Sequence, residues 1–296
     1  MASATNVKQP VRTRLDPLWD LSSRLFSGPR RRTVALVLAC LPLVLFLLLP
    51  LVALVLRVTP ASLLSHLVSV PVAQAIQLSA GTTLISTLLT VLGGTPVAWL
   101  LARRTFRGHA LLDTLLDLPL VLPPAVAGIG LLVTFGRLGL LGHVLSLLGI
   151  QIAFSTTAVV LAQTFVAAPF YVRTAHNAFA RVERQVEQAA ELDGASPAGV
   201  FVYVTLPLTG SALLSGAVMS WARALGEFGA TIIFAGNFPG RTETMPLAIY
   251  LGFQTDLNIA ITLSVVLLVL AFVVLFVVKG ALRQHLDATA QGPFVN

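Results

Sequence analysis

Six long apolar stretches constrain this chain more than any other feature of its sequence. A helix that crosses a bilayer needs about 17–25 predominantly apolar residues. Because backbone polar groups in lipid must be satisfied internally, the stretches predict an all-α integral membrane protein with six transmembrane helices. The stretches are Val34–Leu56, Gln77–Leu101, Leu115–Phe135, Thr156–Val172, Leu208–Phe234 and Leu257–Val278.

The composition supports membrane burial over a soluble fold. Only 10% of the 296 residues are charged and 56% are hydrophobic, whereas a soluble domain carries roughly 25% charged residues. The single cysteine, Cys40, excludes an intrachain disulfide and a cysteine-based metal cluster. A secreted disulfide scaffold and a zinc-finger protein are therefore excluded.

The basic residues predict the orientation of the six helices. The net charge is +7, and 15 of the 19 Lys and Arg residues fall in both terminal segments and in two alternate connections. Cytoplasmic segments carry such an excess, so we expect both termini to be cytoplasmic. The positive charge is thus explained by topology, and nucleic-acid binding loses its main support.

We expect three regions along the chain. Residues 1–33 form a cytoplasmic N-terminal tail, residues 34–282 a transmembrane domain, and residues 283–296 a cytoplasmic C-terminal tail. Apolar residues between Leu15 and Phe26 fit either a helix at the membrane interface or a disordered basic tail.

The longest cytoplasmic connection runs from Arg173 to Pro207. Its first part, Ala178–Gly194, is predicted to be a surface helix with an apolar stripe. Gly194 suits the end of that helix, and Ser196 followed by Pro197 suits the start of another. Two helices at a sharp corner fit either docking to a cytoplasmic partner or an ordinary loop resting on lipid headgroups.

Residues 177–207 of this connection, here named the coupling loop, resemble the EAA loop of ABC-importer permeases. The family pattern is Glu-Ala-Ala, three residues, Gly, nine residues, Ile, one residue, Leu-Pro, and this chain has Gln for the Glu and Val for the Ile. The resemblance implies a type I ABC importer permease whose loop sits in a groove of the ATP-hydrolysing subunit. The implied coupling residues are Glu187, Gln188, Ala189, Ala190, Gly194, Ser196, Phe201, Val204, Leu206 and Pro207.

Two further stretches resemble the molybdate branch of this permease family. They are "WARALGEFGATIIFAGNFPGRTETMPLAIY" (Trp221–Tyr250) and "LPLVLPPAVAGIGLL" (Leu118–Leu132). The resemblance implies import of molybdate or tungstate by a homodimer, with two ATPase subunits and an extracytoplasmic oxyanion-binding protein. Sulfate and thiosulfate permeases share a related element and remain an alternative, as does a stand-alone secondary transporter or channel.

Motifs for catalysis, cofactors and metals are missing from the sequence. There is no G-x-x-x-x-G-K-[ST], no H-E-x-x-H and no G-x-S-x-G, and the five histidines are scattered. We therefore expect no catalytic, cofactor-binding or metal site, and ATP hydrolysis in a separate subunit.

The fifth apolar stretch contains two charges at helical spacing. Arg223 and Glu227 are four residues apart, so on one helix face they can pair. The pair fits either a path-lining or gating role or a structural lock, and the lock is favoured because a carboxylate repels an oxyanion. Phe228 and Thr231 are a candidate gate. The segment Gly236–Asp256, with Arg241, is predicted to be an outer loop that either meets the binding protein or only connects two spans.

Overall fold

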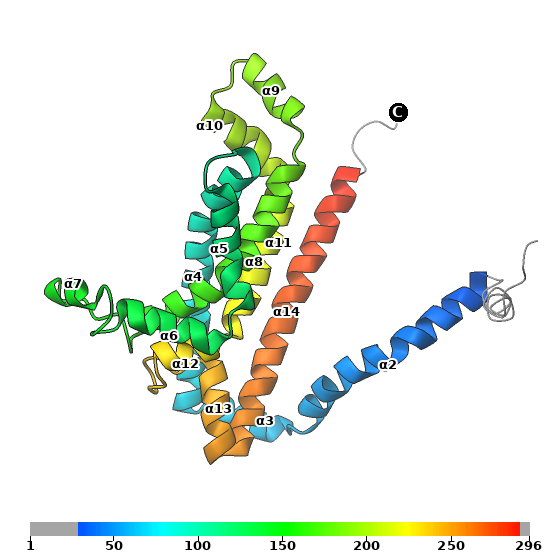
Figure 1. Ribbon diagram of the computed structural model, residues 1–296. Helices are drawn as coiled ribbons and strands as arrows, with labels where there is room; N and C mark the ends of the chain where they lie inside the picture. Colours follow the sequence, from blue (N-terminus) through cyan, green and yellow to red (C-terminus); the bar gives the residue numbers. More distant parts are fainter. Residues whose placement is uncertain (1–28, 291–296) are drawn as a thin grey trace, which may run out of the picture. The chain divides into compact units, whose positions relative to one another are not determined.

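The computed structural model describes residues 29–290, and every regular element in that range is a helix, which confirms the predicted all-α class (Figure 1). Most of the predicted N-terminal tail, including the candidate interface helix, lies outside the described residues. The chain divides into two compact units, residues 1–57 and 58–296. In the first unit, α2 (Pro29–Leu56) contains the first predicted span, with a mean hydropathy of 2.9 over Thr33–Leu56.

The second unit contains four more long helices that match predicted spans. They are α4 (Val70–Arg103), α8 (Thr156–Arg181), α11 (Leu206–Leu225) and α14 (Leu257–Ala290). Five helices of the described chain, α2 included, are long and apolar enough to cross a membrane, or six if one bent pair counts as a span. The predicted number of spans is therefore reached only with the bent pair.

Two of the predicted spans are not continuous helices. The third is split into α5 (His109–Val121) and α6 (Pro124–Phe135), which meet at an angle of 117°. Consecutive prolines at 123 and 124 explain the bend, because a residue before proline is driven out of the helical conformation. The fifth span ends with α11 at Leu225, and α12 (Gly229–Phe234) follows as a separate short helix.

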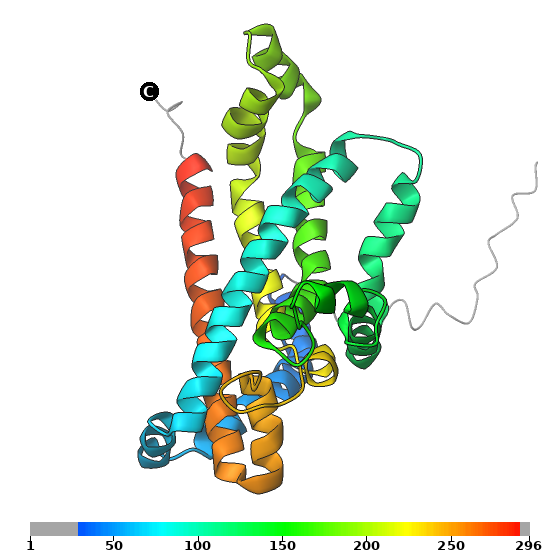
Figure 2. The same ribbon diagram turned by 90° about the vertical axis from the view of Figure 1, so that its left-hand side faces the viewer.

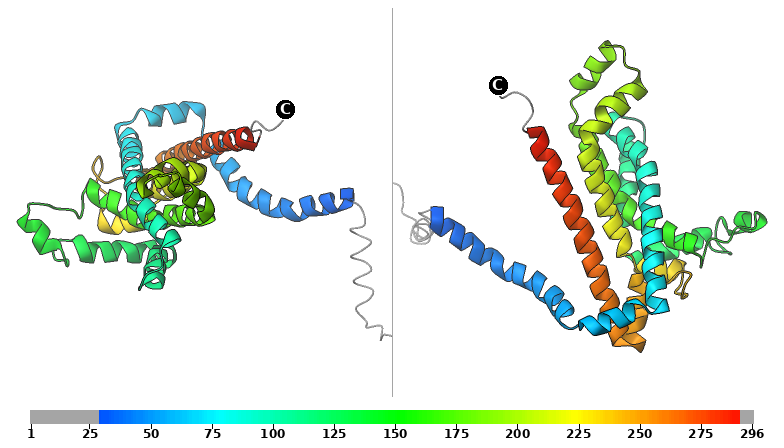
Figure 3. Two further views of the ribbon diagram at one scale, coloured as in Figure 1. Left: turned by 90° about the horizontal axis from the view of Figure 1, so that it is seen from above. Right: turned by 180° about the vertical axis from the view of Figure 1, so that it is seen from behind.

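Three further helices lie in the connections. They are α3 (Pro60–Leu67), α7 (Gly142–Leu147) and α13 (Met245–Thr255). The prediction that Gly236–Asp256 is a loop was wrong for its second half, because α13 begins at Met245 with a proline in its first turn, where the missing N–H costs nothing. α13 packs beside the first part of α14 (Figure 3).

The most buried helix, α8, packs against both α4 and α11 (Figure 2). The Tyr171 ring of α8 is 1% exposed and lies between two glycines. A Cβ on Gly94 of α4 would lie 2.9 Å from the ring, and one on Gly216 of α11 would lie 3.3 Å from it. The Tyr171 hydroxyl is 2.6 Å from the Thr95 hydroxyl. Small residues therefore let the three helices approach closely, as is usual in membrane bundles.

The two broken spans pack against each other at their breaks. Gly128 of α6 faces α12, where an added Cβ would come within 2.8 Å of the Ala230 carbonyl oxygen. Gly229, the first residue of α12, faces Pro124, where an added Cβ would lie 2.7 Å from the proline Cβ. Each short helix thus covers the irregular backbone of the other.

The hydroxyl-rich face of α4 serves helix packing. Ser79, Thr82, Thr83, Ser86 and Thr90 are at most 2% exposed. The Thr82 and Thr83 hydroxyls donate to carbonyls of their own helix at 2.8 and 2.6 Å, and the Ser79 hydroxyl accepts from the Met245 N–H at 2.7 Å. The Ser79, Thr82 and Thr83 hydroxyls are therefore occupied inside the protomer, whereas the buried Thr90 hydroxyl has no hydrogen-bond partner among the described residues.

The packing of α6 on α12 predicts that Gly128→Ala destabilises the protein. The new methyl group meets backbone atoms, which cannot move aside as a side chain can, so a cost of about 1–3 kcal/mol is expected. The thermal unfolding temperature in detergent should fall. Gly130→Ala on the same helix is the control, since nothing lies within 4 Å of its added Cβ. Equal unfolding temperatures for the two variants would contradict the packing.

Candidate coupling loop and intramembrane site

The corner of the coupling loop is built by Gly194. α9 (Arg184–Leu192) ends there, and Gly194 has φ +93°, a left-handed conformation that favours glycine. The Gly194 N–H donates to the Glu191 carbonyl and the Ala195 N–H to the Ala190 carbonyl, both at 3.0 Å. These are the two hydrogen bonds of a Schellman motif. The predicted helix end at Gly194 is confirmed.

A second helix begins directly after the corner. The Ser196 hydroxyl accepts from the Gly199 N–H at 3.2 Å, and Pro197 opens α10 (Pro197–Val200). A single π-turn, η1 (Phe201–Thr205), then joins α10 to α11. The predicted cap and helix start are confirmed. The helix predicted over Ala178–Gly194 is instead divided, because α8 continues to Arg181 and α9 starts at Arg184.

Glu187 ties this corner to the membrane-spanning helices. Its Oε1 lies 2.8 Å from the Arg103 guanidinium at the end of α4 and accepts from the Thr205 hydroxyl at 2.7 Å. Arg103 also donates twice to the Val182 carbonyl at 3.1 Å. The Arg103 and Glu187 side chains are only 9% and 17% exposed. One carboxylate therefore connects α9 to the ends of α4 and α11.

Phe201 makes the aromatic contacts at the base of the same loop. Its ring lies 6.1 Å, centre to centre, from both Trp99 of α4 and Phe179 of α8. By contrast, the Leu192 side chain at the end of α9 is 89% exposed. The loop therefore has an anchored base and a free tip, which projects at one end of the helices (Figure 1).

The predicted coupling residues divide between the base and the tip. The partly buried ones are Glu187, Ala190, Phe201, Val204 and Leu206. The exposed ones are Gln188, Ala189, Gly194, Ser196 and Pro207. Gln188, Ala189, Gly194 and Ser196, together with Leu192, form the free surface of the loop, whereas Pro207 lies in the first turn of α11.

The intramembrane pair forms, although not on one continuous helix as predicted. Arg223 Nη1 lies 2.8 Å from Glu227 Oε2, but Glu227 lies beyond the end of α11. Glu227 Oε1 accepts from the Ala230 N–H at 2.8 Å, in the first turn of α12. The Glu227 side chain is 1% exposed. The carboxylate thus joins the end of one helix to the start of the next, which agrees with a locking role.

The two candidate gate residues do not share a surface. The Phe228 ring lies 5.2 Å from the Tyr250 ring, and both line an apolar cavity of about 470 Å³ between the α11–α12 junction, α13 and α14. Thr231, on α12, is fully buried and does not line this cavity. Phe228 therefore stays the better gate candidate in this conformation.

One ion-pair cluster was not predicted from the sequence. Its centre is Arg173, which lies inside α8. Its guanidinium donates to both oxygens of Asp117 at 2.6 Å, to the Asp113 carboxylate at 2.5 Å and to the Asp113 carbonyl. The sequence does show two carboxylates one helical turn apart, Asp113 and Asp117. It does not show their partner, because Arg173 belongs to another helix. The cluster holds α5 against α8.

Among the described residues, no group of three or more His, Cys, Asp or Glu side chains is placed to hold a metal ion. Long apolar helices, broken spans that pack on each other and a rigid loop at one end define a multi-spanning membrane transport subunit. The comparisons with known proteins narrow this class.

The chain belongs to the family of binding-protein-dependent transport system inner membrane components, whose family model matches residues 94–289. It is 47% identical over 232 residues to the molybdenum transport system permease protein ModB of Mycobacterium tuberculosis, covering 78% of this chain and 88% of that relative. It is 46% identical over 183 residues to ModB of Escherichia coli, covering 62% and 80%.

Solved structures agree on the fold. A bacterial ABC transporter that imports alginate matches with a TM-score of 0.66 at 16% identity, covering 91% of this chain and 97% of that chain. The MetNI methionine ABC transporter matches with a TM-score of 0.54 at 17% identity, covering 72% and 94%. The chain is therefore a multi-pass inner-membrane permease subunit with the type I ABC importer fold, and the family predicted from the sequence is confirmed.

The anchoring by Glu187 predicts that Glu187→Ala loosens the coupling loop. The change leaves the Arg103 guanidinium, which is largely buried, without its carboxylate, at a cost of about 1–3 kcal/mol. Amide hydrogen exchange over residues 184–205 should become about tenfold faster or more. Glu191→Ala, on the exposed face of the same helix, is the control. An unchanged exchange rate in Glu187→Ala would refute the anchoring role.

The geometry of Glu227 predicts different outcomes for two substitutions. Glu227→Gln loses the charge but keeps an oxygen that accepts from the Ala230 N–H, whereas Glu227→Ala loses both and leaves the Arg223 guanidinium unpaired. We expect Ala to lower the thermal unfolding temperature and transport more than Gln does. Exchanging the two charges, Arg223→Glu with Glu227→Arg, should also destabilise, because arginine cannot accept that hydrogen bond. If Glu227→Gln and Glu227→Ala lowered the unfolding temperature and transport equally, the negative charge would be the essential property of Glu227. The hydrogen bond to the Ala230 N–H would then not be needed.

Proposed function

We propose that this chain is the permease subunit of an ATP-driven ABC importer for molybdate or tungstate. The proposal on the substrate is supported by the relatives described above, which are molybdenum transport permeases. The resemblance of Trp221–Tyr250 to the molybdate branch points in the same direction. The observation that carries the transport mechanism is the rigid, anchored coupling loop.

In the proposed complex, two copies of the chain enclose a central path, two ATPase subunits bind the coupling loops, and one extracytoplasmic binding protein delivers the oxyanion. When the two ATPase subunits close around bound ATP, they would push on the exposed tip of each coupling loop. The contacts of Glu187 and the aromatic contacts of Phe201 would transmit that displacement to α4, α8 and α11. The permease would thereby alternate between inward-open and outward-open states.

The proposed topology places the coupling loop and both termini in the cytoplasm. Its support is the distribution of basic residues along the sequence. The opposite end of the helices, with α7, α12 and α13, would face the binding protein.

Two other functions make different demands on the chain. A sulfate or thiosulfate permease would have the same fold, so only substrate selectivity distinguishes it. A stand-alone carrier or channel would not need a docking loop and should remain active after deletion of the coupling loop.

The proposed function is tested by reconstituting the chain in liposomes with its ATPase and binding protein. We expect molybdate, more than sulfate, to stimulate ATP hydrolysis and to be taken up. Leu192→Glu should reduce both activities at least about tenfold, because it places a charge on the exposed apolar tip that meets the ATPase. Its thermal unfolding temperature should stay unchanged, since the side chain touches little in the protomer.

Leu192→Met is the matched control and should retain coupling. Full activity of Leu192→Glu, or transport without any ATPase subunit, would contradict the coupling mechanism. Stimulation by sulfate but not by molybdate would move the chain to the sulfate alternative.

A further inference from the structure

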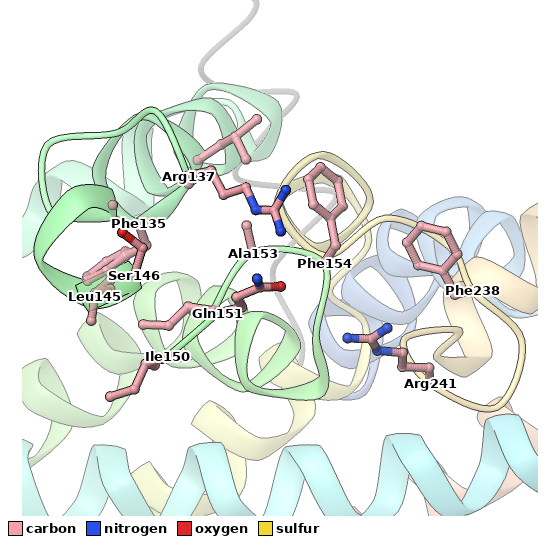
Figure 4. A pocket seen from close by; sticks show the side chains of 14 residues that line it. Phe135, Arg137, Leu145, Ser146, Ile150, Gln151, Ala153, Phe154, Phe238 and Arg241 are labelled. Carbon is pink, nitrogen blue, oxygen red and sulfur yellow. The ribbon is translucent and has the colours of Figure 1, made fainter. Parts of the chain in front are cut away.

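A cavity of about 350 Å³ lies beside the end of α6, α7 and the segment that leads into α8 (Figure 4). The loop between α12 and α13 closes its other side. Its apolar wall includes Phe135, Ile150, Phe154 and Phe238. In size it falls within the range of small-molecule sites.

The polar groups of this cavity are cationic or neutral. Arg137 and Arg241 both line it, and none of the fourteen lining residues is acidic. Figure 4 shows both guanidinium groups turned toward the cavity, with the Gln151 amide between them. Within the described part of the chain, neither guanidinium has an ion pair or a hydrogen bond. Their donors are therefore free for a ligand.

The loops that carry these groups are held in place by hydrogen bonds. The Phe154 N–H donates to the Phe234 carbonyl at 3.1 Å, with Phe154 itself in a left-handed conformation at φ 61°. The Thr156 hydroxyl donates to the Arg241 carbonyl at 2.9 Å, and the Thr242 hydroxyl accepts from the Phe238 N–H at 3.0 Å. Both sides of the cavity are thus fixed to neighbouring helices before a ligand arrives.

The nearest acidic residue in the sequence does not neutralise the cavity. Glu243 is two residues after Arg241, but it is 6% exposed and does not line the cavity. Burial raises the pKa of its carboxyl above the ordinary value. The cavity lies far from α9 and α10 (Figure 1), so in the proposed topology it opens on the extracytoplasmic side.

We propose that this cavity is an entry site for a tetrahedral oxyanion dianion, which binds between Arg137 and Arg241 after release from the binding protein. The proposal rests on the proposed function and extends it to a site within the permease. Two guanidinium groups match the two negative charges of a molybdate-like anion, and guanidinium forks suit oxyanions. The aromatic wall strengthens these charge interactions, whereas exposure of both arginines to solvent keeps binding reversible.

A carboxylate of the binding protein is the competing occupant. A single carboxylate would balance only one of the two guanidinium groups and leave the other unpaired in the cavity. The charge balance therefore favours the dianion, and the experiment below separates the two occupants.

The test measures binding of radiolabelled molybdate to the full chain in lipid nanodiscs without the binding protein. We expect saturable binding that unlabelled sulfate reduces, that equimolar nitrate does not reduce, and that weakens as salt is raised. Arg137→Gln and Arg241→Gln should each weaken binding about tenfold or more, and the double variant should abolish it. Arg57→Gln, at a residue that does not line the cavity, is the matched control and should bind normally.

Three results of the binding measurements would overturn the proposal: no saturable binding to the unchanged chain, unchanged binding in the double variant, or arginine variants that lose only their affinity for the binding protein. The third result would assign the arginines to a partner carboxylate. Molybdate uptake by the reconstituted complex separates this proposal from the proposed function. Uptake that is equal in wild type and double variant would reject the entry site alone, whereas an absence of molybdate uptake by the unchanged complex would reject the function.

Discussion

The packing of α6 against α12 is the contact on which the membrane-embedded structure depends. A bilayer offers no partner to free backbone groups, so a span can be interrupted only where protein covers the interruption. Here two interrupted spans cover each other. Gly128 and Gly229 allow the close approach, and the Glu227 carboxylate satisfies an N–H at the start of α12. The breaks are therefore stable features of the fold.

Buried and half-buried charges then connect the helices to one another and to the coupling loop. Arg173 joins α8 to α5, Arg223 is held beside the start of α12, and Arg103 joins α4 to the coupling loop. Each of these guanidinium groups meets a carboxylate, which offsets the cost of removing it from water. The two arginines of the outer cavity differ, since they lack such a partner in the described chain and keep their donors available.

The coupling loop illustrates how rigidity serves the proposed function. A displacement applied at the tip reaches the membrane only if the base does not yield. The Schellman corner at Gly194 fixes the angle between α9 and α10, while Glu187 and Phe201 connect the base to three spanning helices. In the proposed mechanism, the permease moves as a consequence of these contacts and needs no chemistry of its own.

Local features of this protein were determined by the sequence alone. Apolar stretches of bilayer length predicted the spans, and Gly194, Ser196 and Pro197 predicted the corner, because these signals act over a few neighbouring residues. The tertiary structure decided what depends on distant partners. It showed that α12 packs on the bent third span, that Arg173 meets Asp113 and Asp117, and that Arg137 and Arg241 share one cavity. Each case brings together residues more than 50 positions apart, and no local pattern in the sequence records which of them will meet.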